Sequence, residues 1–170
     1  MDVLYISLGV LVVLYIFVMI ILPAVKFNKA KKKLSVYSNF KVYKKKYYDF
    51  TIENDDLKLF IRVVDVPKNS MITINSKDTW CLSWGGSSKD LGRAYPNKRY
   101  LDEISPFLRK EYTSDKKALK VILVNESTEK IVRYLNESEL AVVNFNDTPY
   151  GYKIMEVSKL ESQMDILGIK

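Results

Sequence analysis

Residues 3–25 read VLYISLGVLVVLYIFVMIILPAV, an apolar run without a single charged side chain. As a helix rising about 1.5 Å per residue, the run is about 35 Å long. That length is enough to cross a hydrocarbon core of about 30 Å with some tilt. The run therefore predicts a transmembrane signal-anchor helix over residues 1–25, with the rest of the chain beside a membrane.

Two other interpretations of the run fit less well. A cleaved signal peptide has a basic segment before an apolar stretch of about 7–15 residues and a small-residue cleavage site after it. Here only Met1 and Asp2 precede the run, the run is longer, and no good cleavage site follows. A buried core helix of this length needs a large protein around it, whereas the remaining residues make about one domain.

The residues after the run set the predicted orientation. Residues 26–46 hold nine lysines and no acidic residue, whereas no lysine or arginine precedes the run. The positive-inside rule then places the N-terminus outside the cell membrane and the C-terminal side in the cytoplasm. Phe27, Ala30 and Leu34 recur at near-helical spacing, so the membrane helix is expected to continue as a basic amphipathic helix.

The same basic juxtamembrane segment predicts a contact with lipid. A polybasic stretch is attracted to the anionic lipids of the inner leaflet by about 1 kcal/mol per suitably placed lysine. The lysines that we expect to face these lipids are Lys26, Lys29, Lys31, Lys32, Lys33, Lys44, Lys45 and Lys46. The alternative is that the lysines only enforce the orientation of the helix.

The net charge of +7 belongs to this segment. Residues 47–170 carry 18 basic and 19 acidic side chains, so the part of the chain beyond it is close to neutral. A DNA-binding protein normally carries its basic patch on the binding domain itself. The distribution therefore favours a lipid bilayer, with a protein partner beside it, over nucleic acid.

Composition excludes several kinds of chemistry. The chain has no histidine, so it has no Ser-His or Cys-His nucleophile–base pair and no histidine-ligated zinc. The single cysteine, Cys81, excludes an intramolecular disulfide and fits a reducing cytosol. Catalysis would have to come from carboxylates, lysine, arginine, tyrosine or a metal bound by oxygen ligands. High usage of Lys, Asn, Ile and Tyr suggests an AT-rich bacterial genome.

Residues 47–170 are expected to form one cytosolic α+β domain with a mixed sheet flanked by helices. Strands are predicted at 47–53, 57–66, 71–74, 79–84, 118–124, 140–145 and 150–157, and helices at 97–112, 127–135 and in the C-terminal tail. The first two strands are expected to form a hairpin. The strand–helix–strand order over 118–145 predicts parallel pairing through a right-handed crossover.

A succession of short motifs runs through residues 40–135. Asp49 lies on the first predicted strand, and the second carries Phe-Ile-Arg-Val-Val-Asp at 60–65. Trp80, a Gly85-Gly86 loop and a Tyr-Pro-Asn-Lys segment at 95–98 follow. This order resembles the restriction-endonuclease-like core, in particular the nuclease-related domain of bacterial proteins. In that family an Asp on one strand is followed by Val-(Val/Ile)-Glu-x-Lys on the next.

The chain departs from this family at the residues that carry the chemistry. The resemblance places Arg62 where the family has its catalytic Glu and Val64 where it has its Lys. Such nucleases hold Mg²⁺ with two carboxylates and use the lysine to align or activate the attacking water. An arginine repels the cation, and a valine does none of the work of the lysine. The resemblance therefore implies a catalytically inactive module that binds or scaffolds, without a cofactor.

Two further hypotheses remain open at this point. In a shifted register, Asp49 and Glu53 share a face of one strand and, with Asp65, would hold Mg²⁺ in a membrane-tethered nuclease. Lys58 or Lys77 would then supply the ammonium group. The competing interpretation is that acids bordering a hairpin are solvated turn residues. The other hypothesis is that the chain is a small accessory subunit of a membrane complex.

Basic and aromatic residues in the middle of the chain predict a possible ligand or partner surface. Arg93, Lys98 and Arg99 alternate with tyrosines, a combination that contacts phosphate or stacks on a base, although a solvated loop also explains it. Trp80 and Trp84 lie four residues apart on one predicted strand and point to the same side. They are typical either of a core or of a paired-tryptophan surface for a partner.

Overall fold

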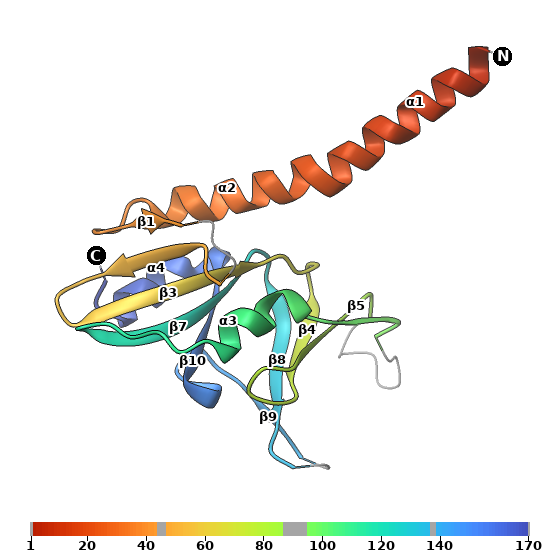
Figure 1. Ribbon diagram of the computed structural model, residues 1–170. Coiled ribbons are helices and arrows are strands. Elements are labelled where there is room, and N and C mark those ends of the chain that lie inside the picture. The colour runs from red at the N-terminus through yellow and green to blue at the C-terminus, as the bar shows by residue number, and fades with distance from the viewer. Residues whose placement is uncertain (1, 44–46, 87–94, 137–138, 170) are drawn as a thin grey trace.

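The computed structural model describes residues 2–43, 47–86, 95–136 and 139–169, with side chains from residue 9 onward (Figure 1). A long N-terminal helix leads into an α+β domain built on two five-stranded sheets. Figure 1 shows the second half of this helix lying along the domain, while the first half extends away from it. The predicted class, an apolar N-terminal helix followed by an α+β domain with mixed sheets, is confirmed.

The long helix consists of α1 (Asp2–Ile16), one π-helical turn (Phe17–Ile21) and α2 (Leu22–Leu34). The stretch Gly9–Leu34 is long and apolar enough to cross a membrane, and its most apolar part is not buried against the domain. Pro23 lies in the first turn of α2. A proline has no N–H and crowds the carbonyl four residues earlier, so the wider π turn just before it lets the helix continue.

The C-terminal half of the helix is part of the domain core. Ala30 and Leu34 have no exposed surface, and the ring of Phe27 stacks on that of Phe50 at 5.0 Å between centroids. The apolar residues recur every three or four positions, which places them on one stripe of α2. The predicted continuation of the apolar helix into an amphipathic basic helix is therefore confirmed.

The first sheet has the order β1-β2-β3-β7-β10, in which β3, β7 and β10 are parallel and the other pairs are antiparallel. Its strands are β1 (Lys41–Val42), β2 (Phe50–Glu53), β3 (Leu57–Val64), β7 (Lys117–Val124) and β10 (Tyr152–Glu156). The strand β7 lies between β3 and β10 and is covered on both faces. This position explains its nearly continuous apolar run, Val-Ile-Leu-Val at 121–124.

The second sheet has the order β6-β5-β4-β8-β9, with β4 parallel to β8 and the other pairs antiparallel. Its strands are β4 (Ser70–Ile74), β5 (Trp80–Trp84), β6 (Asn97–Tyr100), β8 (Thr128–Tyr134) and β9 (Leu140–Val142). Two short helices complete the domain, α3 (Ser105–Arg109) and α4 (Leu160–Ile166). They follow 3₁₀ turns at Asp102–Ile104 and Val157–Lys159.

Two apolar clusters lie on opposite faces of the first sheet. The first core cluster joins Phe60 and Ile122 to the second sheet and α3, including Trp80 and Phe107. The second core cluster joins α2 and α4 to the other face of the first sheet and includes Leu34, Phe50, Leu59, Val121 and Met164. Each strand of the first sheet therefore contributes alternate side chains to two different environments.

The predicted helix at 127–135 is wrong, because Thr128–Tyr134 forms β8. This seven-residue segment is rich in β-branched residues, and it pairs with both β4 and β9. Pairing on both sides outweighs the Ser-Thr cap signal that favours a helix. The predicted crossover unit fails with it, since β7 and β9 lie in different sheets.

The predicted helix at 97–112 is also largely wrong. Asn97–Tyr100 forms the edge strand β6, paired with β5, and only Ser105–Arg109 is α-helical. Pro106 lies in the first turn of α3, where a missing N–H is tolerated. The predicted hairpin at the start of the domain, the strand at 118–124, the edge strand at 150–157 and the C-terminal helix are confirmed.

Candidate functional site

Asp49 lies just before β2 and is bound to β3. Its carboxylate accepts the backbone N–H of Val63 at 2.8 Å and a guanidinium N–H of Arg62 at 3.1 Å. Burial raises the pKa of Asp49, and the hydrogen bond from Val63 and the charge of Arg62 act in the opposite direction. Arg62, which departs from the nuclease pattern, is therefore the ion-pair partner of Asp49, the carboxylate that matches the pattern.

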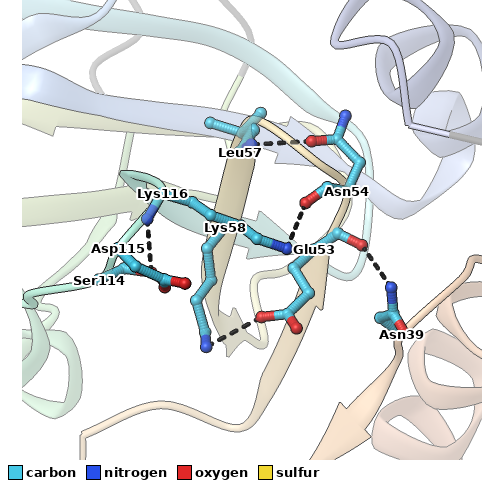
Figure 2. Close-up of polar contacts among 8 residues, drawn as sticks. All are labelled: Asn39, Glu53, Asn54, Leu57, Lys58, Ser114, Asp115 and Lys116. Atoms are coloured by element: carbon cyan, nitrogen blue, oxygen red, sulfur yellow. Dashed lines mark hydrogen bonds and ion pairs between the residues drawn. The ribbon is translucent and has the colours of Figure 1, made fainter.

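Glu53 forms a cross-strand ion pair with Lys58. Figure 2 shows the two side chains converging from β2 and β3, with 2.9 Å between Oε2 and Nζ. The hydrogen bond from Lys58 lowers the pKa of Glu53 and raises that of Lys58. The pair closes the hairpin at the edge of the domain.

The turn between β2 and β3 is held by backbone contacts from three directions (Figure 2). The Asn54 side chain accepts the N–H of Leu57 at 2.8 Å, and Lys116 donates to the Asn54 carbonyl at 2.7 Å. Asn39, beyond the end of α2, donates to the carbonyl of Glu53 at 3.3 Å. These contacts connect α2, the first hairpin and the entry to β7, so the hairpin has a structural role.

The remaining candidates for a metal site lie elsewhere. Asp65, after β3, pairs with Lys26 of α2 at 2.8 Å, and Lys77 pairs with Glu111 at 3.3 Å. Asp49 and Glu53 are four residues apart on extended chain, about 13 Å between Cα atoms at 3.3 Å per residue. Among the residues that the structure describes, no three acidic or cysteine side chains are grouped to hold a metal ion.

The residues of the predicted partner surface lie partly in the core and partly on an exposed edge strand. Trp80 is 1% exposed and packs in the first core cluster, so the core interpretation holds for this residue, while Trp84 is half-buried beside it. Lys98 and Arg99 lie on the exposed edge strand β6. Arg99 binds both carboxylate oxygens of Glu103, at 2.8 and 3.0 Å. Arg93 lies outside the described residues.

The eight lysines that were expected to face lipid fall into three groups. Lys26 and Lys33 attach α2 to the domain, the first through Asp65 and the second through the carbonyl of Val157 at 2.8 Å. Lys29, Lys31 and Lys32 form the second group and have exposed side chains on α2. Residues 44–46 lie outside the described part of the chain.

A buried lysine that the sequence analysis did not single out lies on β7. Lys120 is 9% exposed, and its ammonium group donates to the carbonyl of Leu108 at 2.9 Å. The hydroxyl of Tyr152 donates to the same carbonyl at 3.1 Å. Burial lowers the pKa of Lys120. The available signal was a lysine inside an otherwise apolar strand, Ala-Leu-Lys-Val-Ile-Leu-Val at 118–124.

Glu156 is a second buried charge, at the end of β10. Its carboxylate accepts hydrogen bonds from Thr128 at 3.2 Å and Ser158 at 3.3 Å, and Lys159 lies 3.1 Å away. Thr128 belongs to the second sheet and Glu156 to the first. These contacts join the two sheets, so Glu156 has a structural explanation that Lys120 lacks.

Comparison of the chain with protein-family models, with curated proteins and with solved structures finds no match. The functional argument therefore rests on the geometry of the chain itself.

Proposed function

We propose that this chain is a single-pass membrane protein whose domain is a binding or scaffolding module at the inner face of the cell membrane. The observation that carries the proposal is the continuity between the apolar helix and the domain. Within the first turns after the apolar run, Phe27 and Ala30 already pack into the second core cluster. A domain joined in this way keeps one orientation relative to its helix, as a membrane-surface module requires.

Contacts of Lys26 indicate which part of the domain lies nearest the membrane. Lys26 is the first charged residue after the apolar run, so it belongs at the level of the lipid headgroups. It pairs with Asp65 at 2.8 Å, and a guanidinium nitrogen of Arg99 lies 3.5 Å from the Asp65 carbonyl oxygen. The end of β3 and the edge strand β6 are therefore expected at headgroup depth.

The distance from Val25 along the helix determines which lysines lie within range of the surface potential of the membrane. At about 1.5 Å per residue, Lys29 lies about 6 Å and Lys31 about 9 Å beyond Val25. The surface potential decays within a Debye length, about 8–10 Å at physiological salt. Lys29 and Lys31 lie within this range, and Lys98 adds an exposed charge from β6. The proposed lipid contact thus combines the helix with one edge of the domain.

The acidic residues support binding in preference to hydrolysis. Asp49, Glu53 and Asp65 each form an ion pair with a different basic side chain, and these pairs lie at different places in the domain. A Mg²⁺ ion at any of them would have to displace a lysine or arginine. A module that uses its carboxylates for internal structure fits a binding role.

The orientation is tested with the full chain in native membranes. A C-terminal epitope tag is expected to be digested by added protease in inside-out vesicles and protected in right-side-out vesicles. The reverse pattern would contradict the proposal. A soluble chain, released by alkaline carbonate, would contradict the membrane anchor itself.

The proposed depth of β6 is tested with single fluorophores on Cys81→Ser protein in vesicles of phosphatidylglycerol and phosphatidylethanolamine. A label at Lys98→Cys is expected to be quenched by headgroup-labelled lipid. A label at Asp55→Cys, in the turn at the opposite end of β3, serves as the matched control. Equal quenching at the two positions would contradict the orientation. Mg²⁺-dependent cleavage of DNA or RNA that Asp49→Ala abolishes would replace the binding role with a nuclease.

A further inference from the structure

Lys120 lies in the middle of the first sheet, where a charge is costly. Its neighbours across the ladder are Phe60 of β3 and Tyr152 of β10. An ammonium group has three N–H donors, and within the described residues Lys120 has one hydrogen bond, to Leu108. Glu111 lies 3.9 Å away, beyond hydrogen-bond distance. A buried charge with unused donors calls for an explanation.

The ammonium group adjoins a cavity of about 200 Å³. Its walls include Lys77, Glu111, Tyr112, Lys120, Tyr150 and Tyr152. The Lys120 nitrogen lies 5.5 Å from the ring centroid of Tyr112 and 5.3 Å from that of Tyr152, so the two rings contribute cation–π attraction on the protein side. At about 30 Å³ per water-sized group, the cavity holds about seven such groups.

Tyr112 contributes its ring to the wall of the cavity. Its hydroxyl is buried and has no hydrogen-bond partner among the described residues. Burial raises the pKa of Tyr112, and the neighbouring groups that also act on it are Tyr48, Arg62 and Tyr47, so the hydroxyl belongs to the core beside them. The donors that line the cavity are therefore the ammonium groups of Lys120 and Lys77.

Glu111 shows what kind of group the two lysines attract. Its carboxylate lies 3.3 Å from the Lys77 nitrogen and 3.9 Å from that of Lys120. The Glu111 side chain is 74% exposed, and an exposed ion pair is weak, so a competing oxyanion displaces it at little cost. The Glu111 carboxylate thus lies beside both lysines on the wall of the cavity, where it competes with any oxyanion that enters.

The backbone beside the cavity is strained. Tyr150 has φ of 52° and Gly151 has φ of 81°, in the 3₁₀ turn Pro149–Gly151 that leads into β10. The left-handed region suits glycine and costs a tyrosine free energy. Such strain persists where the surrounding structure needs one particular placement, and here it places Tyr150 on the wall of the cavity.

We propose that this cavity binds the phosphate or carboxylate group of a small soluble molecule between Lys120 and Lys77. The oxyanion accepts hydrogen bonds from the two ammonium groups and displaces the Glu111 carboxylate. Lys120 lies four residues before the end of β7, so the cavity is set back from the strand end that Asp65 follows. The inference stands independently of the membrane anchor.

The test uses the full chain in detergent, titrated with inorganic phosphate and, separately, with succinate. Binding is followed by NMR of lysine side chains labelled at Cε. Saturable binding with Kd of about 1 mM or tighter is expected for at least one probe, with a shift of the Lys120 resonance. The relative affinities distinguish a phosphate from a carboxylate ligand. Absence of saturation at fifty times that concentration of both probes overturns the proposal.

Three variants locate the site. Lys120→Met is expected to weaken binding at least tenfold, since a hydrogen bond to a charged group is worth that factor. Lys117→Met removes an exposed charge from the same strand and should leave Kd unchanged. Glu111→Gln should tighten binding several-fold by removing the competing carboxylate. Weaker binding by Glu111→Gln, or equal losses in the two lysine variants, overturns the proposal.

A fourth variant covers the case in which Lys120→Met does not fold. Lys77→Met changes a side chain that is 55% exposed, so it is expected to fold as the parent does. It should weaken binding about tenfold through loss of one charge-assisted hydrogen bond. An unchanged Kd in this variant overturns the assignment of Lys77 and, with it, the proposed site.

Discussion

The two faces of the first sheet each bury a lysine, and the two lysines differ in how they are bound. Lys153, on β10, is 9% exposed and donates to the carbonyls of Phe145 at 2.6 Å and Asn146 at 3.0 Å. Lys120 is equally buried on the opposite face and has one carbonyl acceptor beside a cavity. Burial lowers the pKa of both. The two lysines thus share their degree of burial and the direction of their pKa shift. Lys120 differs in having N–H donors without an acceptor, among the described residues, beside a cavity.

The same contrast extends to the elements that cover the sheet. The face toward α2 and α4 is closed by the second core cluster, in which Leu34 and Met164 have no exposed surface. The face that carries Lys120 has aromatic rings, including Tyr112 stacked on Phe60 at 4.6 Å. We interpret the first face as the attachment of the domain to its helix and the second as the face that binds a ligand.

The largest expected effect is on the attachment face. Leu34→Ala removes a fully buried side chain between α2 and the sheet, and such truncations cost about 2–5 kcal/mol. Urea unfolding of the full chain in detergent, followed by tryptophan fluorescence, measures the loss. The control is Val36→Ala, at a side chain that is 76% exposed, with an expected change below about 0.5 kcal/mol. Similar values for the two variants would show that α2 is not packed on the domain.

The two lysines are compared directly by replacing each with methionine. Lys153→Met leaves the carbonyls of Phe145 and Asn146 without their charged donor, so we expect a loss of about 2 kcal/mol. Lys120→Met leaves one carbonyl that keeps the Tyr152 hydroxyl, and it removes a buried charge, so we expect a loss below about 1 kcal/mol. Equal losses would erase the distinction between a structural and a ligand-facing lysine.

Tyr112→Phe is expected to raise the free energy of unfolding by a smaller amount, in contrast to the losses above. Removing a buried hydroxyl that has no partner among the described residues should stabilise the fold by about 1 kcal/mol near pH 7. Destabilisation by that amount would mean that the hydroxyl is hydrogen-bonded in the folded protein.

The same variant should change the alkaline limb of the stability profile. Burial raises the folded-state pKa of Tyr112 above its usual value near 10, so the folded state holds its proton when the unfolded state releases it. Stability is then complete below pH 10 and falls as the pH rises above it. Urea unfolding at pH 9, 10 and 11 should show a shallower fall for Tyr112→Phe than for the parent. Tyr152, whose pKa burial raises to about 12, remains in both proteins.

Sequence reasoning succeeded where the signal is local. The β2–β3 hairpin has its polar turn at Asn54, whose side chain accepts the N–H of Leu57, and the stretches on both sides are rich in β-branched and aromatic residues. The stripe of Phe27, Ala30 and Leu34 likewise predicts from spacing alone that α2 is amphipathic, and the structure packs this stripe on the domain. Both features depend on residues close together in the chain.

Reasoning failed where the partner strand is distant in sequence. The segment Thr128–Tyr134 is too short to show a clear period, and the strand β4 that fixes it as β8 lies about sixty residues earlier. The candidate site has the same property. Lys120 and Tyr152 meet only because β7 lies beside β10, and nothing in their spacing indicates that neighbourhood.

The smallest expected effect concerns the hairpin that the sequence did predict. Glu53→Gln breaks the ion pair with Lys58 but keeps a side chain of the same shape, and both partners are partly exposed. Such pairs contribute about 0–1 kcal/mol, and salt reduces the contribution further. We expect a loss of about 0.5 kcal/mol at low salt that fades in 1 M NaCl, measured by urea unfolding. A loss above 2 kcal/mol that persists in salt would contradict a weak, solvent-screened pair. Binding of phosphate or succinate should be unchanged, because the hairpin closes the sheet while the ligand site lies around Lys120.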